Sequence, residues 1–399
     1  MVSLVEERTA DFQFQFYRHR TCSLARAMLA HRHHPNPSSE EEGLYKARTF
    51  HSPLTGTFPY PIRYLTMVKA KHWIEPHPQG IYVRPADIWI DPSSPKQHAM
   101  VTHGHADHAR GGHGEVWATP ETLAIMGLRY GTDAGTPLGY GEGFERGGVR
   151  FSLHSAGHVL GSAQVLMEYD GERVVVTGDF KRRPDPTCAP FEPVPCDVFI
   201  TEATFGLPVF KHPPIKGEID KIFARLEAEP DHCLLVGAYA LGKAQRVIAE
   251  LRRAGWDRPI YLHGAQVKMC ELYEELGVSL GELRLVMDTP KEEMRGQIII
   301  CPPSALIDKW SRRLPSPVTA MASGWMRVRG RARQRGVEIP LVISDHADWD
   351  ELTATIRELA PKETWITHGS EDGLLRWCEL HQIKARALAM IGREDGDDG

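Results

Sequence analysis

The sequence concentrates potential metal ligands in one short segment, His103-Gly104-His105-Ala106-Asp107-His108. Three imidazoles and a carboxylate within six residues add nothing to the stability of a helix or a strand. Burying them is also costly unless a positive charge lies among them. Imidazole and carboxylate groups together suit zinc, manganese or iron. The segment therefore predicts a site for a divalent metal ion.

Three more candidate ligands follow predicted strands elsewhere: His158 after "SLHSAG", Asp179 after "VVVTG" and His368 after "TWIT". A lone histidine is more often an ordinary core or surface residue. Here the total of five histidines and two aspartates exceeds what a single tetrahedral metal site uses. Two metal ions sharing a bridging carboxylate would use all seven. A metal pair about 3.5–4 Å apart generates hydroxide and stabilises charge at a phosphoryl centre.

Composition limits the class of protein. The chain has 399 residues, of which 42% are hydrophobic and 25% charged, and its net charge of −5 argues against a polybasic nucleic-acid binder while allowing a local positive groove. No segment approaches the roughly 18–20 apolar residues of a membrane span. The N-terminus has no secretory pattern, so a cytoplasmic protein without membrane contact is expected. Seven cysteines without CxxC spacing predict reduced thiols.

The hydrophobic pattern predicts an interrupted domain. Short strands separated by turns dominate from Met67 to about Leu207, with one helix over residues 120–130. Strands then alternate with helices of 10–15 residues, which predicts a parallel sheet with helical crossovers. The first pattern returns near residue 339. The expected parts are a flexible N-terminal extension, a first domain in two pieces, an inserted domain between them and an acidic tail: 1–66, 67–207 with 339–392, 208–338 and 393–399.

The ordered motifs "HGHADH", "GHVLGSAQV", "TGDF", "SDHAD" and "THG" resemble the metallo-β-lactamase superfamily, specifically its β-CASP nuclease branch. The resemblance covers about residues 68–391. Within that branch, "WIEPHPQGIYV" and "GDFKRRPDPTCAPFEPVPCDVFITEATFG" resemble the bacterial ligase-associated DNA exonucleases. The implied fold is α/β, an αββα metallo-β-lactamase sandwich with an inserted β-CASP domain of parallel α/β type.

The resemblance also implies roles for the candidate ligands, with two divalent ions, zinc or manganese, as cofactors. The first ion would be held by His103, His105 and His158. The second would be held by Asp107, His108 and His368. Asp179 would bridge both ions.

Further residues match motifs that support the centre. Asp91 in "WIDP" matches a carboxylate that holds a ligand histidine. Glu202 and His346 match a carboxylate–imidazole pair near the scissile phosphate, where the carboxylate favours a protonated imidazole that can donate to the leaving oxygen. The acidic neighbours of His346 could instead cap a helix, which is the preferred interpretation for Asp348.

Basic and small polar residues are the candidate contacts for substrate phosphates. Lys181, Arg182 and Arg183 directly follow Asp179, and Lys243 lies at a predicted strand-to-helix junction that could bind phosphate. Ser323 precedes a Trp and five arginines in "SGWMRVRGRARQR". The Trp could stack on a base or lie buried.

These observations predict a metal-dependent DNA exonuclease in which a two-metal-activated hydroxide hydrolyses phosphodiester bonds, in DNA repair. The expected partners are DNA single strands or ends, with RNA as the alternative, and a functional association with a DNA ligase and helicase. His368 favours the alternative, an RNA-processing ribonuclease, because that histidine is usual in such β-CASP members. A small-molecule hydrolase needs neither the insertion nor the Glu202–His346 pair, and a non-catalytic scaffold would have lost ligands. Strand polarity, the metal used and oligomeric state stay open.

Overall fold

The computed structural model describes residues 69–131 and 135–388, which form three sheets. The predicted N-terminal extension and acidic tail lie outside these residues. Within the described residues, no helix combines the length and apolar character that crossing a bilayer requires. Six of the seven cysteines fall in the described part, and all six are free thiols, as expected.

Two sheets pack face to face. The first contains six strands in chain order, β1 (Ile74–His77), β2 (Gly80–Val83), β3 (Ile88–Ile90), β4 (His98–Met100), β5 (Glu115–Ala118) and β6 (Thr136–Pro137). The second has the order β19-β18-β11-β10-β9-β8-β7. Its strands are β7 (Gly143–Arg146), β8 (Val149–Ser155), β9 (Ala163–Tyr169), β10 (Glu172–Val176), β11 (Val198–Ala203), β18 (Glu363–Gly369) and β19 (Ala385–Ala387). One core cluster joins them, with Ile81 and Ile88 from the first sheet and Phe151 and Val165 from the second.

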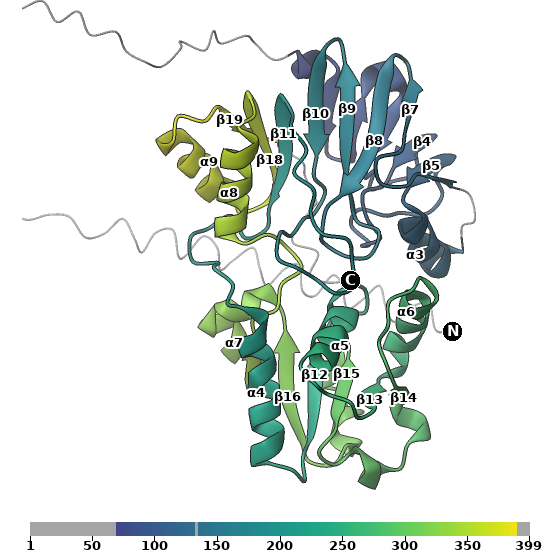
Figure 1. Cartoon of the computed structure of the whole chain (residues 1–399), viewed down its shortest axis with the longest axis vertical. Coiled ribbons are helices and arrows are strands. Elements are labelled where there is room, and N and C mark those ends of the chain that lie inside the picture. Colours follow the sequence, from purple (N-terminus) through teal and green to yellow (C-terminus); the bar gives the residue numbers. More distant parts are fainter. Residues whose placement is uncertain (1–68, 132–134, 389–399) are drawn as a thin grey trace, which may run out of the picture. The chain divides into compact units, whose positions relative to one another are not determined.

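Helices cover both outer faces of this sandwich. The predicted helix over 120–130 is α3 (Pro120–Tyr130), which packs with strand β5 through Met126 and Val116. On the other side, α8 (Trp349–Leu359) and α9 (Glu371–Leu380) cover β11 and β18 (Figure 1), burying Leu352 and Leu374 against Phe199. The αββα sandwich is thereby confirmed.

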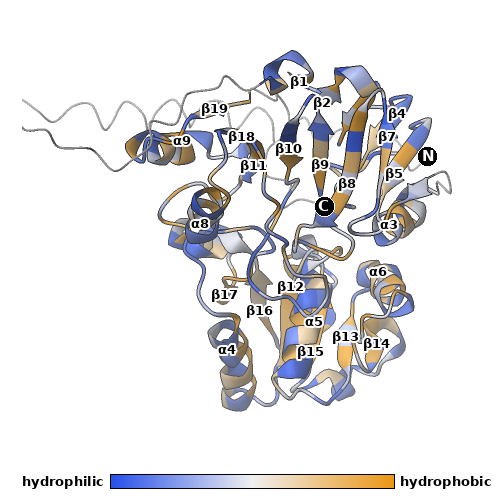
Figure 2. Ribbon diagram, turned by 45° about the horizontal axis from the view of Figure 1, so that its top comes forward, coloured by the Kyte–Doolittle hydropathy of each residue, from blue (hydrophilic) through white to orange (hydrophobic). Residues whose placement is uncertain are grey.

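The third sheet is entirely parallel, with the order β14-β13-β15-β12-β16-β17. Its strands are β12 (Cys233–Gly237), β13 (Ile260–Leu262), β14 (Leu283–Leu285), β15 (Ile298–Cys301), β16 (Pro317–Ala322) and β17 (Ile339–Leu341). Its helices are α4 (Ile215–Ala228), α5 (Lys243–Arg253), α6 (Gly264–Glu275) and α7 (Arg329–Arg335). Strands buried on both faces read as continuous apolar runs, and β15, with the sequence IIIC, is coloured as hydrophobic in Figure 2. The inserted parallel α/β element is therefore confirmed.

The insertion separates two strands that are hydrogen-bonded neighbours. β11 pairs in parallel with β18, although the entire third sheet lies between them in the chain. One difference from the sequence pattern concerns residues 339–341. They were assigned to the returning first domain, but β17 pairs with β16 and adds an edge strand to the third sheet. The apolar run itself could not distinguish two adjacent sheets. The remaining domain limits stay predictions.

Candidate metal centre

The candidate ligands follow strand ends that meet at one edge of the sandwich. β4 leads into the 103–108 segment, the loop between β8 and β9 carries His158, β10 leads to Asp179, and His368 is the penultimate residue of β18. β10, β11 and β18 are mutually parallel, so their carboxyl ends lie side by side. This shared edge explains why side chains far apart in the sequence come together.

The structure brings six of the seven predicted ligands into two groups that share Asp179. Within each group the candidate ligand atoms all lie within 4.8 Å of one another. One group is His103, His105, His158 and Asp179, and the other is Asp107, His108 and Asp179. The carboxylate oxygen Oδ2 of Asp179 lies 3.3 Å from Nε2 of His103 and 3.4 Å from Nε2 of His108. Asp179 is thus placed to serve both groups.

Hydrogen bonds behind the rings fix which imidazole nitrogen faces the centre. His158 donates through Nδ1 to the carbonyl of Asp345 at 2.7 Å, and His105 donates through Nε2 to the carbonyl of Leu241 at 3.3 Å, because a carbonyl can only accept. The other two nitrogens, Nε2 of His158 and Nδ1 of His105, then carry lone pairs and face each other at 2.9 Å. Burial, followed by the neighbouring charge of His103, lowers the pKa of His105 to about 3, which keeps that ring neutral. A cation between the two nitrogens would satisfy both lone pairs.

Asp91 orients two other rings. Its Oδ2 accepts from Nδ1 of His108 at 2.7 Å and from the hydroxyl of Thr102 at 2.6 Å. Since that hydroxyl proton is used, His103 donates through Nδ1 to the oxygen of Thr102 at 3.1 Å. The inward Nε2 atoms of His103 and His108 are buried and have no hydrogen-bond partner among residues 69–131 and 135–388. A left-handed residue in a site often marks function, and Asp91 has φ 45°.

The charge balance of the second group also calls for a cation. Burial opposes charge on His108, but Asp179, Asp107 and Asp91 outweigh it and raise the pKa of His108 to about 9. A buried cluster with this excess of carboxylate binds either a proton or a metal ion. The residues present therefore fit the divalent cofactors that the sequence predicts.

His368 lies beside the second group without belonging to either set of ligand atoms within 4.8 Å. Its ring stacks on that of His108, with centroids 5.3 Å apart. Its backbone is left-handed, with φ 61°. The predicted role of His368 as a ligand remains a prediction, and its position next to His108 is compatible with it.

The predicted pair of Glu202 and His346 forms. Nδ1 of His346 lies 3.1 Å from Oε2 of Glu202 and 3.9 Å from Oδ2 of Asp179. Glu202 is fully buried, its other oxygen accepts from the backbone N–H of Phe180 at 2.7 Å, and the β11–β18 register shifts beside it. Bulges near active sites re-aim side chains. Asp348 caps α8 by accepting from the N–H of Glu351, which confirms its interpretation as a cap.

Two predicted phosphate contacts are instead buried in an ion-pair network. Lys181 is fully buried and pairs with Asp185 at 2.6 Å. Lys243 pairs with Asp345 at 2.8 Å, and Arg246 joins Asp345 to Asp185 at 3.2 and 3.3 Å. Lysines enclosed with carboxylates cannot reach a substrate without breaking these pairs. The expectation for Lys181 and Lys243 is therefore corrected.

At the start of α5, where a phosphate site is expected, the backbone N–H of Gly242 already has a hydrogen-bond partner in the protein. The side-chain oxygen of Gln245 accepts from the N–H of Gly242 at 2.8 Å. Ser323 is buried, and its hydroxyl accepts from the N–H of Trp325. Trp325 is only 9% exposed, so the buried interpretation of this ring holds.

The other two basic residues after Asp179 reach side chains of the α8 region. Arg182 pairs with Glu358, and Arg183 pairs with Glu351 at 3.2 Å. Arg183 also donates to the carbonyl of His346 at 3.3 Å, which ties this arginine to the loop that carries His346. Both keep about a quarter of their side chains exposed, so phosphate contact stays a prediction for them.

Sequence reasoning missed the groups that fix the rings from behind. The carbonyls of Leu241 and Asp345 leave no residue-type signal, because every residue has a carbonyl. Thr102 immediately precedes His103, and a hydroxyl beside a ligand was the only available sign. Gly178 belongs to the same arrangement: its φ is 56°, and a Cβ there would lie 2.6 Å from the hydroxyl of Thr102.

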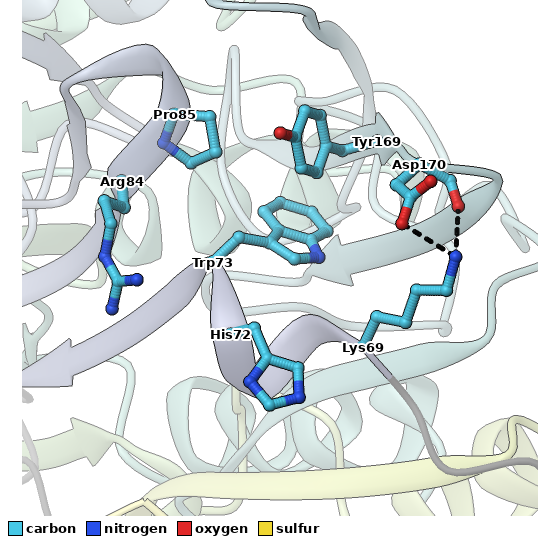
Figure 3. A pocket seen from close by; sticks show the side chains of 7 residues that line it. All are labelled: Lys69, His72, Trp73, Arg84, Pro85, Tyr169 and Asp170. Atoms are coloured by element: carbon cyan, nitrogen blue, oxygen red, sulfur yellow. Dashed lines mark hydrogen bonds and ion pairs between the residues drawn. The ribbon is translucent and has the colours of Figure 1, made fainter.

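A separate surface pocket of about 350 Å³ lies at the opposite end of β10 from Asp179 (Figure 3). Trp73 and Tyr169 form its apolar part, with ring centroids 5.4 Å apart, and Lys69 pairs with Asp170 at its edge. His72 is the one imidazole among its lining residues. The pocket contains none of the candidate ligands and offers no comparable chemistry.

Replacing Asp91 with Asn tests the orienting role of that carboxylate. Asn has one acceptor oxygen in place of two, so it cannot accept from the backbone N–H of Thr102 on one side and from the Thr102 hydroxyl and His108 on the other. Affinity for Mn²⁺ should therefore fall about 10–100-fold, measured by calorimetric titration. Asp170→Asn is the matched control, because Asp170 is also left-handed (φ 50°) but pairs with Lys69 at the surface. Equal affinities in the two variants would contradict the role of Asp91.

The raised pKa of His108 predicts proton release on metal binding. Near neutral pH the metal-free protein holds a proton there, since its pKa is about 9, and a cation bound at Nε2 displaces about one proton. Binding heats should therefore depend on the ionisation enthalpy of the buffer. That dependence should disappear above the pKa. A heat independent of the buffer at neutral pH would show that His108 is already neutral.

Comparison with known proteins identifies relatives but no family model matches the chain. The chain is 30% identical over 357 residues, 82% of its length, to a protein named probable DNA ligase from Opitutus terrae. It is 32% identical over 133 residues to cleavage and polyadenylation specificity factor 73 from Drosophila melanogaster, and 28% identical over 134 residues to an RNase J-like protein from Methanocaldococcus jannaschii. These two matches each cover 31% of this chain.

The aligned parts make up 34%, 19% and 32% of the three relatives, so the chain spans about a third or less of their length. Their names come from both DNA and RNA metabolism, and the sandwich with its inserted parallel sheet accords with the resemblance that the motifs indicated. The chain is thus similar to nucleases of the β-CASP branch of the metallo-β-lactamase superfamily.

Proposed function

We propose that this protein is a metal-dependent nuclease that hydrolyses phosphodiester bonds, with DNA as its substrate. The observation that carries the proposal is the convergence of fixed imidazole lone pairs and the shared carboxylate of Asp179 at one buried centre. Nuclease relatives support the same reaction class, and three of them are named endoribonuclease.

The residues divide the work as follows. His103, His105 and His158 would hold one divalent ion, and Asp107, His108 and His368 would hold the second, with Asp179 common to both groups. The ions, zinc or manganese, supply Lewis acidity that activates water and neutralises charge developing at phosphorus.

Glu202 and His346 complete the proposed chemistry. Glu202 holds Nδ1 of His346 at 3.1 Å, which keeps the ring at the centre and favours its protonated form. His346 then donates a proton to the leaving oxygen, a role that general acids fill with gains of about 10²–10⁴ in rate. Small esters with good leaving groups need no such acid, which favours a phosphodiester substrate.

DNA is the proposed substrate because an alignment that covers 82% of the chain is with a protein named for DNA ligation. We extend this to exonuclease action in DNA repair, in functional association with a DNA ligase and helicase in the cytoplasm. Ribonuclease activity is the second candidate. His368 and the relatives named endoribonuclease and cleavage and polyadenylation specificity factor favour it.

Asp179→Ala tests the reaction class. Loss of the carboxylate shared by both groups should lower cleavage of a labelled strand at least about 1,000-fold, with little loss of strand binding. Chelator should abolish wild-type cleavage, and Mn²⁺ or Zn²⁺ should restore it. Asp220→Asn, at an exposed position on α4, is the control. Full activity in chelator would refute the proposal.

End-labelled DNA and RNA strands of identical sequence test the substrate and the mode of action. The proposal predicts faster hydrolysis of DNA, with a product ladder that shortens progressively from one end. The same ladder reveals the polarity, since the label is placed at either end in turn. Preferential cleavage of RNA, or internal cuts at the earliest times, would instead establish the ribonuclease or an endonuclease.

A further inference from the structure

One part of the inserted domain is strongly basic although the chain is acidic overall. Residues 309–337 include eight Lys or Arg and no Asp or Glu, whereas the whole chain has a net charge of −5. Five of the eight are exposed arginines at alternate positions across the 3-10 helix η7 (Gly324–Arg327) and α7. We name them the arginine tract: Arg327, Arg329, Arg331, Arg333 and Arg335.

The positive charge of the tract is not neutralised within the described protein. The ion pairs of residues 69–131 and 135–388 include none of the five arginines, whereas Arg182, Arg183 and Arg225 elsewhere each pair with a glutamate. Arg329 and Arg333 are four residues apart in α7. Like charges at this spacing destabilise a helix. A bound polyanion would remove this repulsion.

Aromatic packing holds the tract close to the proposed active site. The guanidinium carbon of Arg331 lies 3.7 Å from the ring centroid of Trp325. The ring of Trp325 lies 4.8 Å from that of Phe205, which in turn lies 6.1 Å from the ring of His346. A Cβ at Gly324 would come within 2.4 Å of Phe205, so the backbone approaches that ring closely. Trp325, which contacts Arg331 of the tract, is therefore linked to His346 through two aromatic contacts.

We infer that the arginine tract binds the sugar–phosphate backbone of the nucleic-acid strand outside the bond being cut. This inference rests on the proposed function. Each strand of a B-form duplex carries one charge per about 3.4 Å of helix axis, and a single strand likewise carries one charge per nucleotide, so several phosphates beyond the scissile one can face a row of five arginines. Guanidinium groups match phosphate geometry and read no base, so the contact is independent of sequence. The tract then favours long strands over short ones.

The double variant Arg329→Gln with Arg333→Gln tests the inference and leaves Arg331 on Trp325. Binding of a long single strand is measured in chelator, where no cleavage occurs, at several salt concentrations. Loss of two phosphate contacts should reduce the slope of log affinity against log salt by about 1.4. With metal restored, the KM for the long strand should rise, whereas hydrolysis of bis(p-nitrophenyl) phosphate should be unchanged.

The matched control is Lys268→Gln with Lys291→Gln, which removes two exposed charges of the same domain that form no ion pair in its described part. A salt slope that changes equally in both double variants, or in neither, overturns the inference. Binding of polyglutamate, a polyanion without phosphates, is measured in parallel. If the arginine double variant loses as much affinity for polyglutamate as for the strand, the inference that the tract binds nucleic acid is overturned. Binding is measured in chelator, where no cleavage occurs, so it is tested separately from activity. A wild-type protein that binds the strand through the tract but never cuts it would refute the proposed function. The same result would leave this inference supported.

Discussion

The metal centre depends on the fixed orientation of four buried imidazoles. Each ring donates one N–H outward, to Asp91, Thr102 or a backbone carbonyl, and so turns its other nitrogen inward. A neutral imidazole has only one proton, so the outer acceptor decides the inner chemistry. If those acceptors moved, a ring could turn its N–H toward the centre and the site would lose a ligand. The acceptors are therefore as necessary as the ligands.

Two of these acceptors lie outside the sandwich strands, one within the inserted domain and one just after its last strand. The carbonyl of Leu241 precedes α5, and that of Asp345 follows β17. The ion pairs of Asp345 with Lys243 and Arg246 fix this region, and their charges lower the pKa of Asp345 against the effect of burial. Buried ion pairs seldom add stability, but they do enforce one arrangement. Here that arrangement sets the position of the carbonyl that orients His158.

The sequence predicted the ligands and the fold class because both depend on residue types at particular positions. Imidazoles and carboxylates after apolar runs indicate strand ends, and parallel strands bring such ends together. Whether a charged side chain is buried could not be predicted from the sequence in the same way. Lys181 and Lys243 look like phosphate ligands in the sequence, and only the folded chain encloses them with carboxylates. Backbone carbonyls carry no sequence signal at all, and β17 could equally have extended either of two sheets.

The pairing of β11 with β18 also has a consequence for synthesis of the protein. A chain emerging from the ribosome exposes one edge of β11 until residues 363–369 are made, because the neighbour of that strand comes after the whole insertion. Open strand edges invite association with other chains. His346 and His368 also arrive only at this late stage. An incomplete polypeptide thus contains most of the candidate metal ligands but lacks two residues of the proposed active site, so under the proposed function a nascent chain would be inactive.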